Sequence, residues 1–318
     1  MSIDRVKPHV DVVIAGAGTA GLSAALVLGR ARRNVLVLNE GLPRNAPAHA
    51  AQGVFTRDGT SPLELLRIGR EQLQPYTSVE VRDGSVVDVE GTNGKFRVVL
   101  DSGTEVTARK LILATGVVDE LPAIEGFQEL WGAGVYHCPY CHGWEVRDEP
   151  LAVYGRGASA LDHVILLKGW SSDLVLCTDG PSELSDEDRS TLEFMGVPVQ
   201  EDRILRLEGG GGHLRSILFE SGARLERRGL FIRTKQRQRS DLAVRLNCAI
   251  DEAGFIQTDM DGRTSVPGVF AAGDVTGQPQ SVISAAARGA AASGAINHEL
   301  AREDVYGALP IQRSALAS

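Results

Sequence analysis

The feature that most constrains this chain is a glycine turn that stands between a predicted strand and a predicted helix. Residues 10–15 are mostly apolar, as in a buried parallel strand, and residues 22–32 have the apolar spacing of a helix. Between them lies the run Gly16-Ala17-Gly18-Thr19-Ala20-Gly21, which matches G-x-G-x-x-G. Glycines in this place let the backbone approach a pyrophosphate at the helix N-terminus. The turn therefore predicts nucleotide binding, although tight helix–strand packing alone is the alternative.

An acidic residue that holds a ribose hydroxyl is expected about 20 positions after such a turn, at the end of the next strand. Residues 34–38 form that predicted strand, which ends near Asn39 and Glu40. Asn39 occupies the place where the acid itself aligns. We therefore expect either Asn39 or Glu40 to make the contact.

A second glycine turn predicts a second domain of the same kind. Residues 151–154 are predicted to form a strand, Gly155-Arg156-Gly157-Ala158-Ser159-Ala160 the turn, and residues 161–168 a helix. We therefore expect an α/β fold with two Rossmann-like dinucleotide-binding domains of the three-layer ββα type, the second inserted in the first. Alternating runs separated by turn residues also predict a small β-meander, with strands at residues 79–81, 86–89, 96–100 and 105–107.

The end of the chain returns to the first domain. Residues 110–114 are a predicted strand that leads into Ala114-Thr115-Gly116, and residues 266–274 form a strand that reaches Gly273 and Asp274. Gln280-Ser281-Val282 open an alanine-rich helix that is predicted to end near Leu300, and the tail from Gly307 is expected to fray.

The chain leaves the first domain after Ala114-Thr115-Gly116 and returns to it near Phe255, which sets the expected domain boundaries. We expect residues 1–118 and 251–318 to form the first domain, and residues 119–250 to form the inserted one. Within the inserted domain, the four glycines at residues 209–212 are predicted to form a hairpin turn.

The segment His137-Cys138-Pro139-Tyr140-Cys141-His142 carries the chemistry of the inserted domain. Two cysteines separated by two residues can close into a small-loop disulfide, and such a pair has low thiol pKa values and exchanges readily. The flanking histidines make a zinc site the alternative, but a structural zinc site of this type needs a second pair of ligands. Cys177 and Cys248 are isolated, and no second C-x-x-C occurs. We therefore predict a redox pair and no metal.

Composition limits the remaining possibilities. The chain has 318 residues and a formal net charge of −8, which argues against a broad basic surface for nucleic acid or an anionic membrane. Residues 1–10 lack the apolar core of a signal peptide, and no apolar run has the length of a membrane span. Four cysteines do not form a disulfide scaffold in a chain of this length, so we expect a cytoplasmic protein with one redox-active pair.

Four landmarks stand in order: the first glycine turn, Ala114-Thr115-Gly116, the C-P-Y-C pair and residues 268–274. Together they resemble the low-molecular-weight thioredoxin reductase family of flavoproteins, and the resemblance covers nearly the whole chain. It implies FAD in the domain made from both chain ends, with Asp274 on the ribityl chain and the helix start at residues 281–282 facing the flavin. It also implies that Cys141 lies against the flavin and that Cys138 exchanges with substrate.

The residues expected to bind FAD come from both ends of the chain and from the segments that follow the predicted strands. They are Gly16, Gly18, Thr19, Ala20, Gly21, Asn39, Glu40, Asn45, Val87, Ala114, Thr115, Gly116, Gly273, Asp274, Gln280, Ser281 and Val282.

The second nucleotide site departs from the family pattern. NADPH-using members carry a His-Arg-Arg cluster after the second strand of the inserted domain, where guanidinium groups hold the 2′-phosphate. Here that place reads Cys177-Thr178-Asp179-Gly180, and Asp179 is expected to repel a phosphate. The family's Gly-x-x-Pro-Asn stretch is replaced by Arg233-Thr234-Lys235-Gln236-Arg237, a basic run typical of a solvated face. The use of NAD(P)H is therefore doubtful.

The residue after the second cysteine departs as well. Thioredoxin reductases carry an acid there, whereas this chain has His142, and in this it is more similar to the dithiol oxidases of gliotoxin- and holomycin-type biosynthesis. Histidine has an ordinary pKa near 6.5 and is a suitable base for deprotonating a thiol. We expect His142 rather than His137 to have this role, because it takes the place of the acid.

The resemblance implies an FAD-dependent dithiol oxidase that forms a disulfide in a small-molecule dithiol, with O2 as acceptor and H2O2 as product. The alternative enzyme is an NAD(P)H-dependent thioredoxin or disulfide reductase, and the non-enzymatic alternative is a redox-sensing flavoprotein. A homodimer is implied by the resemblance alone. No nucleic acid and no membrane partner is expected.

Overall fold

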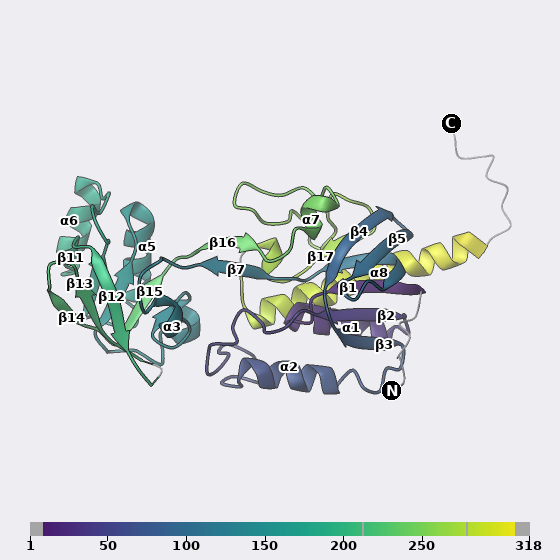
Figure 1. The fold of residues 1–318 in the computed structure, drawn as a ribbon, viewed down its shortest axis with the longest axis horizontal. Helices are drawn as coiled ribbons and strands as arrows, with labels where there is room; N and C mark the ends of the chain where they lie inside the picture. Colours follow the sequence, from purple (N-terminus) through teal and green to yellow (C-terminus); the bar gives the residue numbers. More distant parts are fainter. Residues whose placement is uncertain (1–8, 212, 278, 309–318) are drawn as a thin grey trace. The chain divides into compact units, whose positions relative to one another are not determined.

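The computed structural model describes residues 9–211, 213–277 and 279–308 (Figure 1). The expectations for residues 1–8, for Gly212 in the glycine hairpin and for the tail beyond residue 308 lie outside these residues. The chain divides into two compact units: unit 1 contains Met1–Pro43, Leu63–Val117 and Gln238–Ser318, and unit 2 contains Arg44–Pro62 and Val118–Arg237. Each unit has its own sheet and its own apolar core.

In the described residues, the sheet of unit 1 has seven strands in the order β3-β2-β1-β6-β5-β4, and β17 also pairs with β6. The strands are β1 (His9–Ala15), β2 (Val35–Asn39), β3 (Val79–Asp83), β4 (Val86–Thr92), β5 (Lys95–Leu100), β6 (Glu105–Leu113) and β17 (Val269–Ala271). β1 is parallel to both of its neighbours, β2 and β6, and residues 12–15 are all buried. A strand covered on both faces must be apolar throughout, which explains the apolar run that predicted it.

Helices α1 (Thr19–Arg30) and α8 (Val282–Ala308) pack against each other in unit 1 (Figure 1). Small residues let their backbones approach closely: a Cβ on Gly289 would lie 2.1 Å from the carbonyl oxygen of Ala20. A third helix, α2 (Pro62–Glu71), starts at a proline, whose fixed φ and missing N–H suit the first position of a helix. Among the helices of the described residues, none combines the length and the apolar character that crossing a membrane requires.

The strands after α2 are arranged partly as predicted. β4, β5 and β6 form the antiparallel meander, but this meander continues the main sheet, and β3 pairs in parallel with β2 instead of joining it. β6 is one continuous strand, whereas we expected two strands at residues 105–107 and 110–114. The reason is that residues 108–109 include no turn former, so nothing interrupts the pairing.

Helix α8 continues to Ala308, beyond its predicted end near Leu300. Its later turns are tied to β6 by a lysine that has no exposed side-chain surface. Lys110 Nζ donates to Glu299 at 2.9 Å, to Glu303 at 2.6 Å and to Asn93 at 2.7 Å. A buried cation with three oxygen partners is well compensated, and it holds the extra turns of the helix on the sheet.

In the described residues, unit 2 contains a five-stranded sheet in the order β11-β10-β9-β15-β8 and a three-stranded sheet in the order β12-β13-β14. The strands of the first sheet are β8 (Val135–Tyr136), β9 (Leu151–Tyr154), β10 (Leu174–Cys177), β11 (Val199–Gln200) and β15 (Gly229–Ile232). The second sheet has β12 (Ile204–Gly209), β13 (Leu214–Phe219) and β14 (Arg224–Glu226), and the helices are α3 (Phe127–Leu130), α4 (Pro139–His142), α5 (Gly157–Leu167) and α6 (Asp186–Phe194). The parallel strands around β1 in unit 1 and the parallel five-stranded sheet of unit 2 confirm the predicted fold class.

The units differ from the expected domain boundaries at two places. Residues 44–62 belong to unit 2. There Arg44 donates two hydrogen bonds to the carboxylate of Asp119, from Nε at 2.6 Å and from Nη2 at 2.7 Å. Residues 238–250 belong to unit 1, because Leu242 of α7 (Leu242–Arg245) is buried in the core of that unit. Two paired strands, β7 (Val117–Glu120) and β16 (Lys235–Gln238), lie where the chain passes from one unit to the other.

We expect Lys110→Met to destabilise the protein by about 3 kcal/mol, because it leaves Glu299 and Glu303 close together without their buried cation. The midpoint of urea unfolding, followed by circular dichroism, should fall. The matched control is Lys95→Met on the neighbouring strand β5, where the side chain is exposed and the midpoint should hardly change. A Lys110→Met protein as stable as this control would contradict the anchoring of α8 by Lys110.

Candidate active site

Two glycines of the first turn are required by the packing of the backbone. Gly16 has φ 114°, and a Cβ there would lie 2.2 Å from the carbonyl oxygen of Ala114. A Cβ on Gly21 would lie 1.9 Å from the carbonyl oxygen of Gly16. Side chains at either position would collide with the main chain, so tight packing, the alternative to ligand binding, explains these two glycines.

Gly18 has no such reason to be glycine. Its φ of −72° suits any residue, and no atom lies within 4 Å of the place where its Cβ would stand. Gly18 is the N-cap of α1, and no side chain caps this helix start in the described residues. An uncapped helix start beside open space fits an anionic group such as a pyrophosphate.

Three strand ends bring many of the expected cofactor residues to this turn. β6 lies between β1 and β17 in parallel register, with Leu113 opposite Ala15 on one side and Ala271 on the other. The segments that follow these strands therefore share one edge of the sheet, where ligands of such folds bind. The residues brought together are Gly16, Gly18, Thr19, Ala20, Gly21, Ala114, Thr115, Gly116, Gly273 and Asp274.

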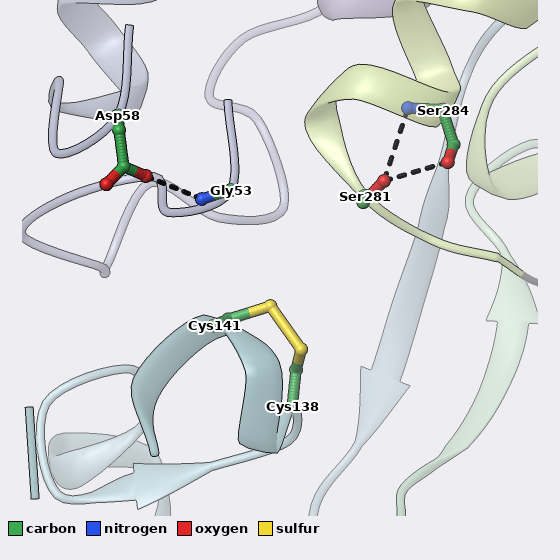
Figure 2. Close-up of a disulfide and its surroundings, with 6 residues drawn as sticks. All are labelled: Gly53, Asp58, Cys138, Cys141, Ser281 and Ser284. Atoms are coloured by element: carbon green, nitrogen blue, oxygen red, sulfur yellow. Dashed lines mark hydrogen bonds between the residues drawn. A yellow bond between two sulfur atoms is a disulfide. The ribbon is translucent and has the colours of Figure 1, made fainter. Parts of the chain in front are cut away.

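The start of α8 belongs to the same edge. Ser281 Oγ accepts a hydrogen bond from the backbone N–H of Ser284 at 3.2 Å and so caps the helix (Figure 2). Gln280 Nε2 donates to the carbonyl oxygen of Asp274 at 3.5 Å, which ties the helix start to the segment after β17. Val282 is the first residue of the helix. Backbone N–H groups at a helix start stabilise negative charge placed before them.

The remaining expected cofactor residues lie in three further segments. Asn39 ends β2, and its Nδ2 donates to Oδ1 of Asp83 at 2.7 Å. Glu40 follows and is exposed, so both residues stay candidates for the ribose contact. Val87 lies near the start of β4 with 44% of its surface exposed. Asn45 belongs to unit 2.

The cysteine pair lies at the start of the short helix α4 in unit 2. Cys138 and Cys141 are joined by a disulfide, with 5.2 Å between their Cα atoms (Figure 2). Both residues are partly exposed, and the disulfide is the form that accepts electrons from a thiol. Cys177 and Cys248 are buried, and burial raises the pKa of Cys177 to about 12, which makes it unreactive. The described residues contain no group of three His, Cys, Asp or Glu side chains that could hold a metal ion.

His142 ends α4, and its imidazole stacks on the ring of Tyr136, with 4.6 Å between the ring centroids and 21° between the planes. Its Nδ1 is buried and has no hydrogen-bond partner among the described residues. Burial, together with the smaller effect of positive charge on the nearby His137 and His49, lowers the pKa of His142 to about 4. We expected His142 to have the ordinary histidine pKa near 6.5, and with the cysteine pair in its disulfide form this was wrong. The imidazole of His142 is neutral at physiological pH.

Asp119 holds the loop that carries His49. Its carboxylate accepts the two hydrogen bonds of Arg44 and one from the hydroxyl of Thr234, at 2.6 Å. Burial by itself raises the pKa of Asp119, but these donors and the charge of His137 outweigh burial, so the pKa is lowered. Asp119 therefore stays ionised and keeps residues 44–62 fixed within unit 2.

The second glycine turn is closed by the backbone of unit 2 itself. The N–H of Gly157, which begins α5, donates to the carbonyl oxygen of Ser182 at 2.8 Å. Arg156 donates through Nε to the carbonyl oxygen of Thr178 at 2.7 Å and through Nη2 to that of Asp179. A helix start binds a phosphate with its N–H groups and a nearby cation. Here the first of those N–H groups and the cation within the turn are engaged by carbonyl oxygens.

Asp179, which we expect to repel a phosphate, is held by two hydrogen bonds within unit 2. Its Oδ1 accepts a hydrogen bond from the backbone N–H of Ile204 at 2.8 Å, and its Oδ2 accepts one from the hydroxyl of Tyr154 at 3.4 Å. The carboxylate therefore ties the loop after β10 to β12. Residues 177–180 also contain no arginine that could hold a phosphate.

Three residues of this site were not identified from the sequence. Tyr136 directly precedes the cysteine segment, and an aromatic residue at the end of a strand was the available signal. Its stack with His142 depends on how α4 folds back on β8, which no local pattern specifies. Arg44 and Asp119 are 75 residues apart, and only the three-dimensional fold pairs them.

Comparisons with known proteins found one matching family model and several similar proteins. A family model described as pyridine nucleotide-disulphide oxidoreductase matches residues 10–289. The chain is 33% identical to a probable thioredoxin reductase of Arthroderma benhamiae, over 83% of this chain and 73% of that protein. It is 30% identical to thioredoxin reductase sirT of Leptosphaeria maculans, over 93% of this chain and 95% of that protein. The crystal structure of HlmI matches with a TM-score of 0.90 and 43% identity, over 95% of this chain and 96% of that one.

Gly18→Ala and Gly21→Ala should have different effects, the first on the binding of FAD and the second on the stability of the fold. A methyl group at Gly18 meets no protein atom, so this variant should fold normally but bind FAD about tenfold more weakly or worse, since the methyl enters the space expected for the pyrophosphate. Gly21→Ala collides with the backbone and should lower the thermal stability itself. Titration of each apoprotein with FAD and a thermal melt distinguish the two effects. Wild-type FAD affinity in Gly18→Ala would refute the assignment of this space.

Proposed function

Since the chain belongs to the pyridine nucleotide-disulphide oxidoreductase family, we propose that it is an FAD-dependent dithiol oxidase. It forms a disulfide in a small-molecule dithiol, with O2 as the electron acceptor and H2O2 as the product. The coarser activity, that of a disulfide oxidoreductase of the thioredoxin reductase type, follows from the family and the relatives. The observation that carries the finer proposal is the closed second glycine turn.

The closed second glycine turn bears on which molecule supplies the electrons. A reductase of this architecture takes them from NAD(P)H, whose phosphates need a free helix start and cationic partners. In unit 2 the N–H of Gly157 and the guanidinium of Arg156 are bonded to carbonyl oxygens, and residues 177–180 contain no arginine. With this route weakened, the substrate dithiol is the remaining source of electrons.

The Cys138–Cys141 disulfide performs the sulfur chemistry. A substrate thiolate attacks Sγ of Cys138, the S–S bond breaks, and Cys141 leaves as a thiolate. The second substrate thiolate then attacks the substrate sulfur of this mixed disulfide, which releases the Cys138 thiolate and the oxidised product. The substrate loses two electrons and two protons. The cysteine pair gains the two electrons, one proton passes to the base described below, and the other passes to solvent.

The family binds FAD, and the residues of unit 1 fit it. When bound, FAD provides a two-electron acceptor for the reduced cysteine pair and a route from there to O2. Gly18 leaves room for the pyrophosphate, and Asp274 stands beside Gln280 for the ribityl chain. The helix start capped by Ser281 offers backbone N–H groups to negative charge.

His142 is the proposed proton acceptor for the attacking thiol. Its imidazole is neutral, and its buried Nδ1 has no hydrogen-bond partner among the described residues, so in the tautomer protonated at Nε2 this nitrogen can accept a proton. Burial disfavours the imidazolium in the disulfide state, but the Cys141 thiolate that forms nearby stabilises it. His137 remains the second candidate, with the ionised Asp119 near it.

The names of the relatives favour a second candidate function. Both fungal proteins are called thioredoxin reductase, which makes an NAD(P)H-dependent disulfide reductase the alternative. In that case residues 178–182 must move away from the second glycine turn, because the carbonyl oxygens that now bond Arg156 and Gly157 come from them.

Two further expectations belong to the proposal. We propose a homodimer, as the family resemblance implies. We also propose that the protein works in the cytoplasm, where buried unpaired thiols such as Cys177 and Cys248 are stable and a single redox-active pair can turn over.

Addition of dithiothreitol to the purified protein in air, with no nicotinamide present, should consume O2 and release H2O2. The electrons of the dithiol have no other acceptor in this mixture. An oxygen electrode and a peroxidase-coupled assay measure the two quantities. Cys138→Ser is the matched control, which should keep its FAD and lose the O2 uptake because the attacked sulfur is gone. O2 uptake that requires NADPH, or none at all with dithiols, would contradict the oxidase proposal.

His142→Ala should lower turnover about 10²-fold at neutral pH, as expected for loss of a proton-transfer group. The pKa of His142 is about 4, so its basic form is present throughout the range above that value, and the wild-type rate should show no rise near pH 6.5. The loss should shrink as pH passes the thiol pKa near 8.5, because thiols then ionise unaided. The pH profiles of both proteins test this, and a loss that is equal at every pH would indicate a packing role instead.

A further inference from the structure

We infer that Tyr136 is a positioning residue for His142: its ring holds the imidazole against the sheet of unit 2 and keeps water away from it. The inference rests on the proposed function, because His142 is the proton acceptor there. Tyr136 acts on the reaction through His142, and its own hydroxyl has no part in the step.

The contacts of Tyr136 fix its ring in place. It is the last residue of β8, and only 6% of its surface is exposed. Its ring stacks on His142 at 4.6 Å and also meets Phe231, at 5.3 Å between centroids and 44° between planes. Phe231 lies opposite Tyr136 on the adjacent strand β15. The imidazole is therefore connected to the sheet through a buried ring that cannot turn without displacing its neighbours.

Gly229 gives this ring its room. A Cβ on Gly229 would lie 3.2 Å from Cε2 of Tyr136 and 3.3 Å from Cδ2 of Leu151. A methyl group there is closer than ordinary van der Waals contact, so it would push the tyrosine ring toward His142 or out of its plane. The missing side chain at Gly229 explains why a large ring fits at the end of β8.

The groups around the two rings set the direction of any pH effect. Burial is the largest cause of the low pKa of His142, with positive charge second. Loss of the tyrosine ring admits water, and hydration raises the pKa of His142 toward its ordinary value near 6.5. The titratable groups that face the rings are His137, His49, Arg228, Glu145 and, once reduced, Cys138 and Cys141.

Two variants separate the tyrosine ring from its hydroxyl: Tyr136→Phe keeps the stack, and Tyr136→Leu removes it. In the holoenzyme with isotope-labelled histidine, the Cε1 resonance of His142 reports the imidazole pKa directly, and its absence from His142→Gln assigns it. We expect Tyr136→Phe to keep the pKa at about 4 and Tyr136→Leu to raise it by about one unit or more.

Dithiol oxidation gives a second readout. Tyr136→Leu should lower kcat about tenfold, since the imidazole is no longer held in position. It should also add a fall in rate below about pH 6, because a protonated imidazole cannot accept the proton of the thiol. Tyr136→Phe should match the wild type in both respects. Circular dichroism and flavin content verify that each variant is folded.

Gly229→Ala tests the same inference if Tyr136→Leu does not fold. Its methyl group displaces the ring without removing it, so the pKa of His142 should rise by a smaller amount. An unchanged pKa of His142 in the folded variants would overturn the inference. Equal losses of activity in Tyr136→Phe and Tyr136→Leu would also overturn it, since the hydroxyl would then be responsible. A wild type that oxidises no dithiol would refute the proposed function alone, because the resonance of His142 still decides the role of Tyr136.

Discussion

Unit 1 depends on direct contact between main chains at the first glycine turn. Gly16 lies against the carbonyl oxygen of Ala114, and Gly21 lies against that of Gly16, so a side chain at either position would force β1, β6 and α1 apart. The contact brings the ends of neighbouring strands and the starts of α1 and α8 to one edge of the sheet. Gly18, which has open space beside it, is then the place where a ligand can approach. In this motif, Gly16 and Gly21 are needed for packing, and Gly18 leaves room for a ligand.

The second glycine turn shows that the same sequence pattern can lead to a different site. Gly157 donates its N–H to a neighbouring loop, and Arg156 crosses to the carbonyl oxygens of residues 178–179. The turn still joins β9 to α5, but the groups that would meet a dinucleotide are engaged within the unit. The reactive group of unit 2 is instead the disulfide, beside a neutral imidazole whose Nδ1 is buried. This combination suits a dithiol as electron donor.

The features that could be predicted from the sequence are those that short patterns determine. Both strand–glycine turn–helix units and the C-x-x-C pair follow from spacing alone, and the structure contains them. Each helix begins earlier than expected, α1 at Thr19 and α5 at Gly157. The extension of α8 was missed because Lys110, distant in sequence, anchors it. Residues 44–62, which we expected in the first domain, belong to unit 2, and the pairing of Arg44 with Asp119 that holds them there is also long-range. The low pKa of His142 arises from burial in the folded unit, which no neighbouring residue indicates.

The central claim is that electrons enter the protein from a dithiol and not from a nicotinamide. The most direct measurement is anaerobic mixing of the FAD-loaded protein with dithiothreitol, NADH and NADPH in parallel, followed through the absorbance of the flavin. The account predicts bleaching by dithiothreitol that is lost in Cys138→Ser, with no bleaching by NADH or NADPH within the time of one turnover. Rapid bleaching by either nicotinamide, with none by the dithiol, would contradict it.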